Sequence, residues 1–201
     1  MRRHLTIALC LVAGCYTPET PDFSPPPSGF EDVPITASVP TCADPYLTTA
    51  ACVLDGDTFD IGSCGEPAER VRMLGLDAPE IAHEPNPADC YGYEATDALE
   101  ALVADQEILL SFDQDCQGLY FRTLAYVWLP LSSGLLTEVD SETRPFEGET
   151  YVLVNTWMVR QGYSKVFDEE IFGTLRLQDA FDQAQDEAEA YDRGLWGACE
   201  G

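Results

Sequence analysis

The chain has 201 residues, of which 36 are acidic and ten are Lys or Arg, so its formal net charge is −26. This balance excludes the broad basic face with which proteins usually bind nucleic acid. The net negative charge of the protein also repels a polyanion. The stretch from Cys42 to Cys199 is long enough for one domain with a core and too short for two comfortable ones.

The N-terminus has the pattern of an export signal. Residues 1–4 are positively charged, and the apolar run 5–13 is too short to span a bilayer. The run closes on Val12-Ala13-Gly14-Cys15, which resembles a bacterial lipobox, in which the cysteine is lipidated and becomes the first residue. We therefore predict a signal peptide at 1–14 and a lipid anchor at Cys15, with the protein in the bacterial cell envelope, on the outer membrane or cell surface. An ordinary signal peptide and a secreted protein are the alternative.

Seven of the chain's 14 prolines fall between residues 16 and 41. Such a stretch cannot bury a core and favours extended polyproline segments of about 3.1 Å per residue. We predict that residues 15–41 are a tether, which holds a globular domain at 42–201 up to roughly 80 Å from the membrane.

Short strands dominate the first half of this domain. We expect them near 52–54, 58–61 and 71–76, and again at 108–112 and 123–129, with a helix at about 94–103 between the two groups. The acidic stretch 130–150 contains Ser and Gly, which predicts an exposed insertion. Helices follow at 154–161, before the natural cap Gly162, and at about 174–191. This order predicts an α+β, mainly β fold, a small closed barrel with about three packed helices.

Two acidic frames are candidates for a site. Asp55-Gly56-Asp57-Thr58 predicts a tight hairpin turn in which Gly56 is free to take a positive φ, although taken alone this frame is only a turn. In the strand that follows, Arg72 shares a face with Leu74 and Leu76 by the two-residue period. Pro79 stops this strand, so Asp77 and Glu80 fall in its exit loop, where sites on rigid sheets usually lie.

Arg122 completes the candidate set at the start of the strand 123–129. A hard divalent cation takes oxygen ligands, and a carboxylate can orient or deprotonate a water. Guanidinium forks hold a phosphate as charge builds on it. Three carboxylates and two arginines therefore suit calcium-assisted phosphodiester cleavage. The alternative is a structural salt-bridge cluster, in which the carboxylates serve as partners for a buried Arg72.

The frames resemble the staphylococcal nuclease (thermonuclease-like) family, from about residue 52 to residue 196. Further matching segments are 154–155, 158–166 and 193–196. The resemblance implies a five-stranded barrel of the OB type. It also implies that Asp57, Asp77 and the backbone carbonyl of Ala78 ligate Ca²⁺.

The resemblance assigns the remaining roles as well. The counterpart of Glu80 orients the attacking water, as general base or through the metal-bound water, and the counterparts of Arg72 and Arg122 bind and stabilise the phosphate. The expected substrate is single-stranded DNA or RNA, the expected state is a monomer, and no protein partner is evident.

The sequence also departs from the family pattern. A cationic residue and a glycine usually stand at the positions of Leu119 and Phe121, and two stacking tyrosines are replaced by Asp168 and Glu170. Tyr120 is our candidate substrate-binding residue, with Tyr163 and Phe167 as alternative stacking surfaces. These departures favour a second hypothesis, a surface binding module that keeps the barrel and the calcium but performs no chemistry.

Charge leaves a third hypothesis open. Removal of Arg2 and Arg3 with the leader leaves eight basic against 36 acidic residues, a net charge of −28. Either the acidic surface surrounds a local positive site, or nucleic acid is no longer the ligand. An esterase for a small phosphodiester needs no extended polyanion track and would tolerate this surface.

Six cysteines remain after the predicted leader and anchor, an even number that suggests disulfides in an exported protein. They are Cys42, Cys52, Cys64, Cys90, Cys116 and Cys199. Their spacings lack the close pairs of a zinc site. We favour Cys90–Cys116, because both lie in loops that flank the candidate site, and Cys52 and Cys64 straddle the first hairpin. Free buried thiols are the alternative.

Overall fold

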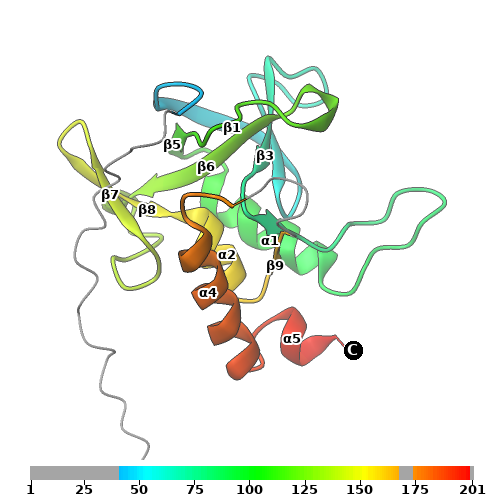
Figure 1. The fold of residues 1–201 in the computed structure, drawn as a ribbon. Coiled ribbons are helices and arrows are strands. Elements are labelled where there is room, and N and C mark those ends of the chain that lie inside the picture. Colours follow the sequence, from blue (N-terminus) through cyan, green and yellow to red (C-terminus); the bar gives the residue numbers. More distant parts are fainter. Residues whose placement is uncertain (1–40, 168–173, 200–201) are drawn as a thin grey trace, which may run out of the picture. The chain divides into compact units, whose positions relative to one another are not determined.

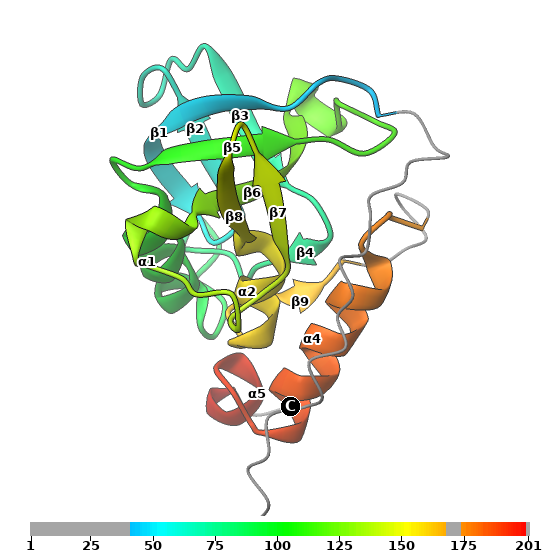
Figure 2. The ribbon, with the colours of Figure 1, turned by 90° about the vertical axis from the view of Figure 1, so that its left-hand side faces the viewer.

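The structure, a computed structural model, describes residues 41–167 and 174–199 (Figures 1 and 2). The predicted leader, the anchor Cys15, most of the tether and the positions Asp168 and Glu170 lie outside the described residues. Within the described part, no helix is both long and apolar enough to cross a membrane.

Five strands close into a barrel. They are β1 (Tyr46–Asp55), β2 (Thr58–Ile61), β3 (Glu69–Met73), β5 (Glu107–Ser111) and β6 (Thr123–Pro130). Antiparallel pairing links β3 to β2, β2 to β1, β1 to β5 and β5 to β6, and a parallel pairing of β3 with β6 closes the ring. The predicted OB-type barrel is confirmed.

The helices lie against one end and one side of this barrel (Figures 1 and 2). They are α1 (Gly92–Val103), α2 (Val154–Arg160), α4 (Gln178–Ala190) and the short α5 (Leu195–Ala198). The apolar face of α1 buries Ala95, Leu99 and Leu102, as their three- and four-residue spacing predicts. The last long helix begins four residues later than expected, at Gln178, and buries Phe181.

A turn interrupts the predicted strand 71–76. The strand β3 ends at Met73, and Gly75 takes a φ of +80° before the short β4 (Leu76–Asp77), which pairs with β9 (Lys165–Val166). A side chain at Gly75 would meet the Phe181 ring at 2.2 Å, so only glycine fits beneath α4. The break redirects the chain and brings Asp77 back towards Arg72.

The predicted insertion at 130–150 is only partly a loop. The strands β7 (Thr143–Phe146) and β8 (Glu149–Leu153) form a hairpin that adds to β6 and extends the sheet beyond the barrel. Phe146 packs edge-on against Tyr151, and Arg144 lies over the ring of Trp128, which explains why part of this acidic stretch becomes strand. In the described part, β7 is the outer edge of the sheet.

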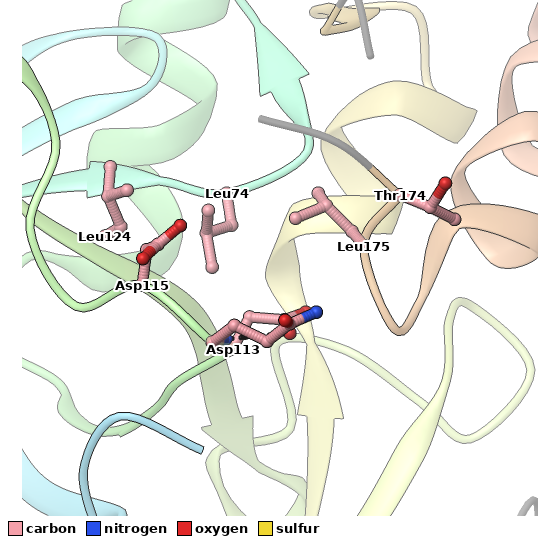
Figure 3. Close-up of a pocket in the computed structure, with 7 residues that line it drawn as sticks. Leu74, Asp113, Asp115, Leu124, Thr174 and Leu175 are labelled. Carbon is pink, nitrogen blue, oxygen red and sulfur yellow. Dashed lines mark hydrogen bonds between the residues drawn. The ribbon is translucent and has the colours of Figure 1, made fainter. Parts of the chain in front are cut away.

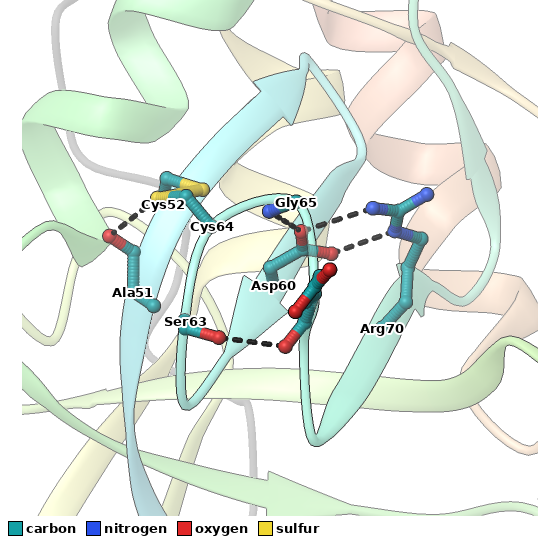
Figure 4. The surroundings of a disulfide bond; sticks show 8 residues. Ala51, Cys52, Asp60, Ser63, Cys64, Gly65 and Arg70 are labelled. Atoms are coloured by element: carbon teal, nitrogen blue, oxygen red, sulfur yellow. Dashed lines mark hydrogen bonds and ion pairs between the residues drawn. A yellow bond between two sulfur atoms is a disulfide. The ribbon is translucent and has the colours of Figure 1, made fainter.

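Three disulfides join the six cysteines, as Cys42–Cys116, Cys52–Cys64 and Cys90–Cys199. The bridge across the first hairpin is therefore confirmed (Figure 4), and the favoured pair Cys90–Cys116 is wrong. Cys90 and Cys116 are apart because the segment that leads into β1 runs beside Cys116, where the Cys42 N–H donates to the Asp113 carbonyl at 2.8 Å. Cys90, just before α1, meets Cys199 at the end of α5 instead.

An ion pair between the buried Asp60 and the partly exposed Arg70 lies beside the hairpin bridge (Figure 4). The Asp60 carboxylate accepts hydrogen bonds from Arg70 Nε at 2.6 Å, from Arg70 Nη2 at 2.9 Å and from the Gly65 N–H at 3.2 Å. The arginine lowers the pKa of Asp60 below its usual value, and the Gly65 hydrogen bond acts in the same direction. Asp60 therefore stays charged although its side chain is fully buried.

Candidate active site

The first acidic frame forms the turn between β1 and β2, as expected. Gly56 does not use the positive φ that is open to a glycine. Glycine is needed here for space: a Cβ would lie 2.6 Å from the Ala78 Cβ and 2.7 Å from the Ala95 Cβ. The hairpin, the exit loop and α1 therefore touch at this point.

Asp57 is the buried centre of the site, with 1% of its surface exposed. Its Oδ1 accepts from Thr58 Oγ1 at 2.8 Å and pairs with Arg72, and its Oδ2 accepts from the Ala78 N–H at 2.9 Å. Burial raises the pKa of Asp57 to about 7; Arg72 opposes this rise, and the nearby Asp55 carboxylate adds to it. Burial therefore outweighs the arginine in setting the pKa of this carboxyl.

Arg72 links the hairpin to the exit loop. Its side chain is 9% exposed, and Nη2 donates to Asp77 Oδ1 at 2.6 Å and to the Leu76 carbonyl at 3.2 Å. Its Cζ lies 5.8 Å from the centre of the Phe167 ring. The structure thus brings three predicted site residues, Asp57, Arg72 and Asp77, into direct contact.

Asp77 and Glu80 form the solvent side of the site, with 57% and 59% of their side chains exposed. The start of α1 fixes the backbone of Glu80: a Cβ on Gly92 would meet the Glu80 carbonyl at 2.4 Å. Partial burial raises the pKa of the Glu80 carboxyl, and the Asp55 carboxylate adds to this. His83 Nε2 lies 3.8 Å from Glu80 Oε2.

Arg122 directly precedes the neighbouring strand β6, which begins at Thr123. Because Arg72 pairs with Leu124 in the parallel register of β3 and β6, Arg122 stands two residues before that partner, on the same face as Arg72. Its guanidinium is turned to its own turn, where Nε donates to the Leu119 carbonyl at 3.4 Å and Cζ lies 5.9 Å from the Tyr120 ring.

The donor chemistry of the corner fits a hard cation. Asp57, Asp77, Glu80 and Asp55 gather around a single arginine, and their carboxylate oxygens are the donors that a hard cation prefers. Within the described residues, no three carboxylate, His or Cys groups are already arranged as a metal cluster, and Arg72 pairs with both aspartates instead. The residues therefore fit Ca²⁺ by donor type.

Sequence reasoning missed Asn155 as a residue that supports the site. This fully buried amide, at the start of α2, accepts from the Val127 N–H at 2.8 Å and donates to the carbonyls of Leu74 at 2.9 Å and Ala125 at 3.3 Å. It therefore fixes the turn that separates Arg72 from Asp77. In the sequence, the sign of this supporting role is a single amide residue directly after the apolar run 152–154.

A pocket of about 180 Å³ lies elsewhere (Figure 3). It is lined by Leu74, Asp113, Gln114, Asp115, Leu124, Thr174 and Leu175, none of which is a candidate site residue. Asp113 is engaged in the fold, because it accepts from the Tyr126 hydroxyl at 2.6 Å and from the Arg176 N–H at 3.0 Å. We assign this pocket no part in the site.

Comparisons with known proteins point to one family. A family model described as "Staphylococcal nuclease homologue" matches residues 70–198, a range that contains Arg72, Asp77, Glu80 and Arg122 and leaves out Asp57. A thermonuclease of Staphylococcus hyicus is 30% identical over 144 residues, which cover 72% of each chain. A thermonuclease of Staphylococcus intermedius is 40% identical over 77 residues, 38% of this chain and 45% of that protein. An uncharacterized protein of Methanocaldococcus jannaschii is 26% identical over 169 residues, 75% of this chain and 72% of that protein.

Proposed function

Because the chain belongs to the staphylococcal nuclease family, we propose that it is a calcium-dependent nuclease that hydrolyses phosphodiester bonds of DNA or RNA by attack of water. One observation carries this proposal furthest: Arg72 is buried between Asp57 and Asp77, with Glu80 on the solvent side of the same corner. With Asp55, four carboxylates and one arginine lie at this end of the barrel strand. A turn or a single ion pair would need fewer charged groups.

Each residue has a proposed role. Asp57, Asp77 and the Ala78 carbonyl would hold Ca²⁺, which when bound neutralises phosphate charge and polarises a phosphoryl oxygen. The exposed Glu80 carboxylate accepts a hydrogen bond from the attacking water and orients it, because the start of α1 fixes its backbone.

The arginines stabilise the charge that builds on the phosphate oxygens. The 3.4 Å hydrogen bond from Arg122 Nε to Leu119 is at the long end for such bonds, so Arg122 can exchange it for a phosphate oxygen. Arg72 lies on the same face of the paired strands, and the two guanidiniums can therefore approach one substrate from neighbouring strands.

Two further features of the proposal concern the whole chain. We propose that Cys15 anchors the exported protein to the bacterial envelope and that the domain acts as a monomer. The anchor is supported by the lipobox pattern and by the proline-rich stretch that follows it.

Cleavage assays on the purified, disulfide-bonded protein test the function. We expect single-stranded DNA or RNA to be cut with millimolar Ca²⁺ and not with EDTA. Glu80→Gln and Arg122→Ala should each lower kcat by about 10²–10³-fold. The control Glu138→Gln removes an equal charge from an exposed position outside the site and should retain full activity.

A binding module is the second candidate, favoured by the engagement of Arg72 with both aspartates. It predicts that Ca²⁺ raises Tm by mass action while no cleavage occurs at any salt concentration. Cleavage of dinucleotides but not of longer strands would instead indicate an esterase for small phosphodiesters.

A further inference from the structure

Three consecutive apolar side chains are exposed in the short helical turn before β6. Leu119, Tyr120 and Phe121 have exposed fractions of 69%, 86% and 84%. We call these residues the apolar turn (η1, Leu119–Phe121). Single exposed apolar residues are common, but a contiguous group of three large ones usually marks a contact surface.

The backbone holds the two rings away from the protein at a steric cost. Tyr120 and Phe121 both have φ = 60°, in the left-handed region where a side chain is unfavourable and glycine is not. The base of the turn is fixed, because the Gly118 N–H donates to the Arg122 carbonyl at 2.9 Å and Cys116 is bonded to Cys42. The rings are therefore presented by a rigid base.

The apolar turn adjoins the proposed phosphate-binding arginine. Arg122 follows Phe121 directly, and its Cζ lies 5.9 Å from the Tyr120 ring. The strands β3 and β6 lie side by side (Figure 1) and pair next to Arg72. A nucleic-acid strand whose phosphate lay between the two arginines would therefore pass close to the apolar turn.

Charge identifies the occupant. With 36 acidic and ten basic residues, the net charge of the chain disfavours contact with a phosphate backbone, so we expect binding to draw also on contacts that are not ionic. Aromatic side chains stack on the open face of an unpaired base, whereas the bases of a duplex are already stacked on one another. The same charge also opposes approach to an anionic membrane.

We propose that Phe121, together with Tyr120, stacks an unpaired base next to the scissile phosphate, so that the substrate is single-stranded nucleic acid held through its bases. This inference rests on the proposed nuclease function. It assigns to Phe121 a role that the family pattern, with a glycine at this position, does not provide.

Phe121→Gly separates this role from a structural one. The variant should raise KM for a single-stranded oligonucleotide about tenfold and leave kcat unchanged, because one stacked base is lost. It should also raise Tm, because glycine accepts the left-handed conformation without strain. Phe121→Ala should raise KM equally without that gain in Tm. The control Val139→Ser alters a side chain that is 90% exposed in another loop and should change neither value.

Abasic oligonucleotides provide a second test of base stacking by Phe121. An oligonucleotide without bases near the cut should bind wild type about tenfold more weakly, and Phe121→Gly should not discriminate between it and the normal strand. An unchanged KM of Phe121→Gly for the normal strand would overturn the inference while the nuclease function stands.

Binding of a strand that carries 2-aminopurine, followed by fluorescence, tests stacking without turnover. If wild type cuts nothing but binds this strand in a Phe121-dependent way, the nuclease function fails and the stacking role is supported. The stacking inference would be overturned if replacing Phe121 left binding of the oligonucleotide unchanged. This would be so in particular if the replacement weakened binding to phosphatidylcholine vesicles or dimerisation instead.

Discussion

Asn155→Ala should destabilise the domain more than any surface change, because one buried amide satisfies two groups on β6 and one in the turn after β3. The substitution leaves the Val127 N–H and the Leu74 carbonyl without their partner, whereas the Ala125 carbonyl keeps the Leu74 N–H at 2.9 Å. Each unsatisfied buried group costs about 1–3 kcal/mol, so the expected loss is about 2–6 kcal/mol. This is a large part of the roughly 5–15 kcal/mol that stabilises a typical domain.

Urea unfolding, followed by tryptophan fluorescence, measures this loss. We expect a lower midpoint with an unchanged m value, and Asn155→Asp should lose as much, because a carboxylate cannot donate to the Leu74 carbonyl. Asn86→Ala, at an exposed loop position, is the matched control and should stay within about 0.5 kcal/mol of wild type. A loss below about 1 kcal/mol for Asn155→Ala would refute the hydrogen-bond account.

Three other properties can be checked directly. Replacing both Cys90 and Cys199 by Ser opens a link across 109 residues and should cost up to about 5 kcal/mol in thermal or urea unfolding; an unchanged stability would contradict the bridge. Asp60 has a lowered pKa when folded, so its stabilisation is complete above the usual Asp pKa and is lost as acid protonates it; Asp60→Asn should flatten the fall in Tm below about pH 4, and an unchanged fall would exclude this contribution. Raising salt from about 50 to about 200 mM should not weaken binding of a single strand, because screening relieves the repulsion by the acidic surface; a steep decline would reveal a basic track.

The elements that follow from local pattern were predictable. Periodicity and turn residues close together in the sequence predict the turn at 55–58, the helix α1 and the main barrel strands. The break at Gly75 was not predictable, because it depends on Phe181, which is more than a hundred positions away. The pairing of Cys90 was missed for the same reason, since its partner approaches only when α5 docks.

Three of the candidate residues meet as the sequence suggests, and their other contacts were less predictable. A resemblance supplied the residues, and the structure joins Asp57, Arg72 and Asp77 as expected for one site. The orientation of Arg122 towards Tyr120 follows from a turn conformation that no periodicity encodes. The supporting amide of Asn155 was overlooked because a single polar residue after an apolar run carries no pattern of its own.

The hairpin beyond the barrel has a consequence for crowding. An outer strand with free N–H and C=O groups invites strands of other molecules and so promotes aggregation. Pro145 stands in the middle of β7 and offers no N–H, and Arg144 adds a charge beside it. If many copies were tethered side by side at a surface, this short, interrupted edge would keep them from joining into a continuous sheet.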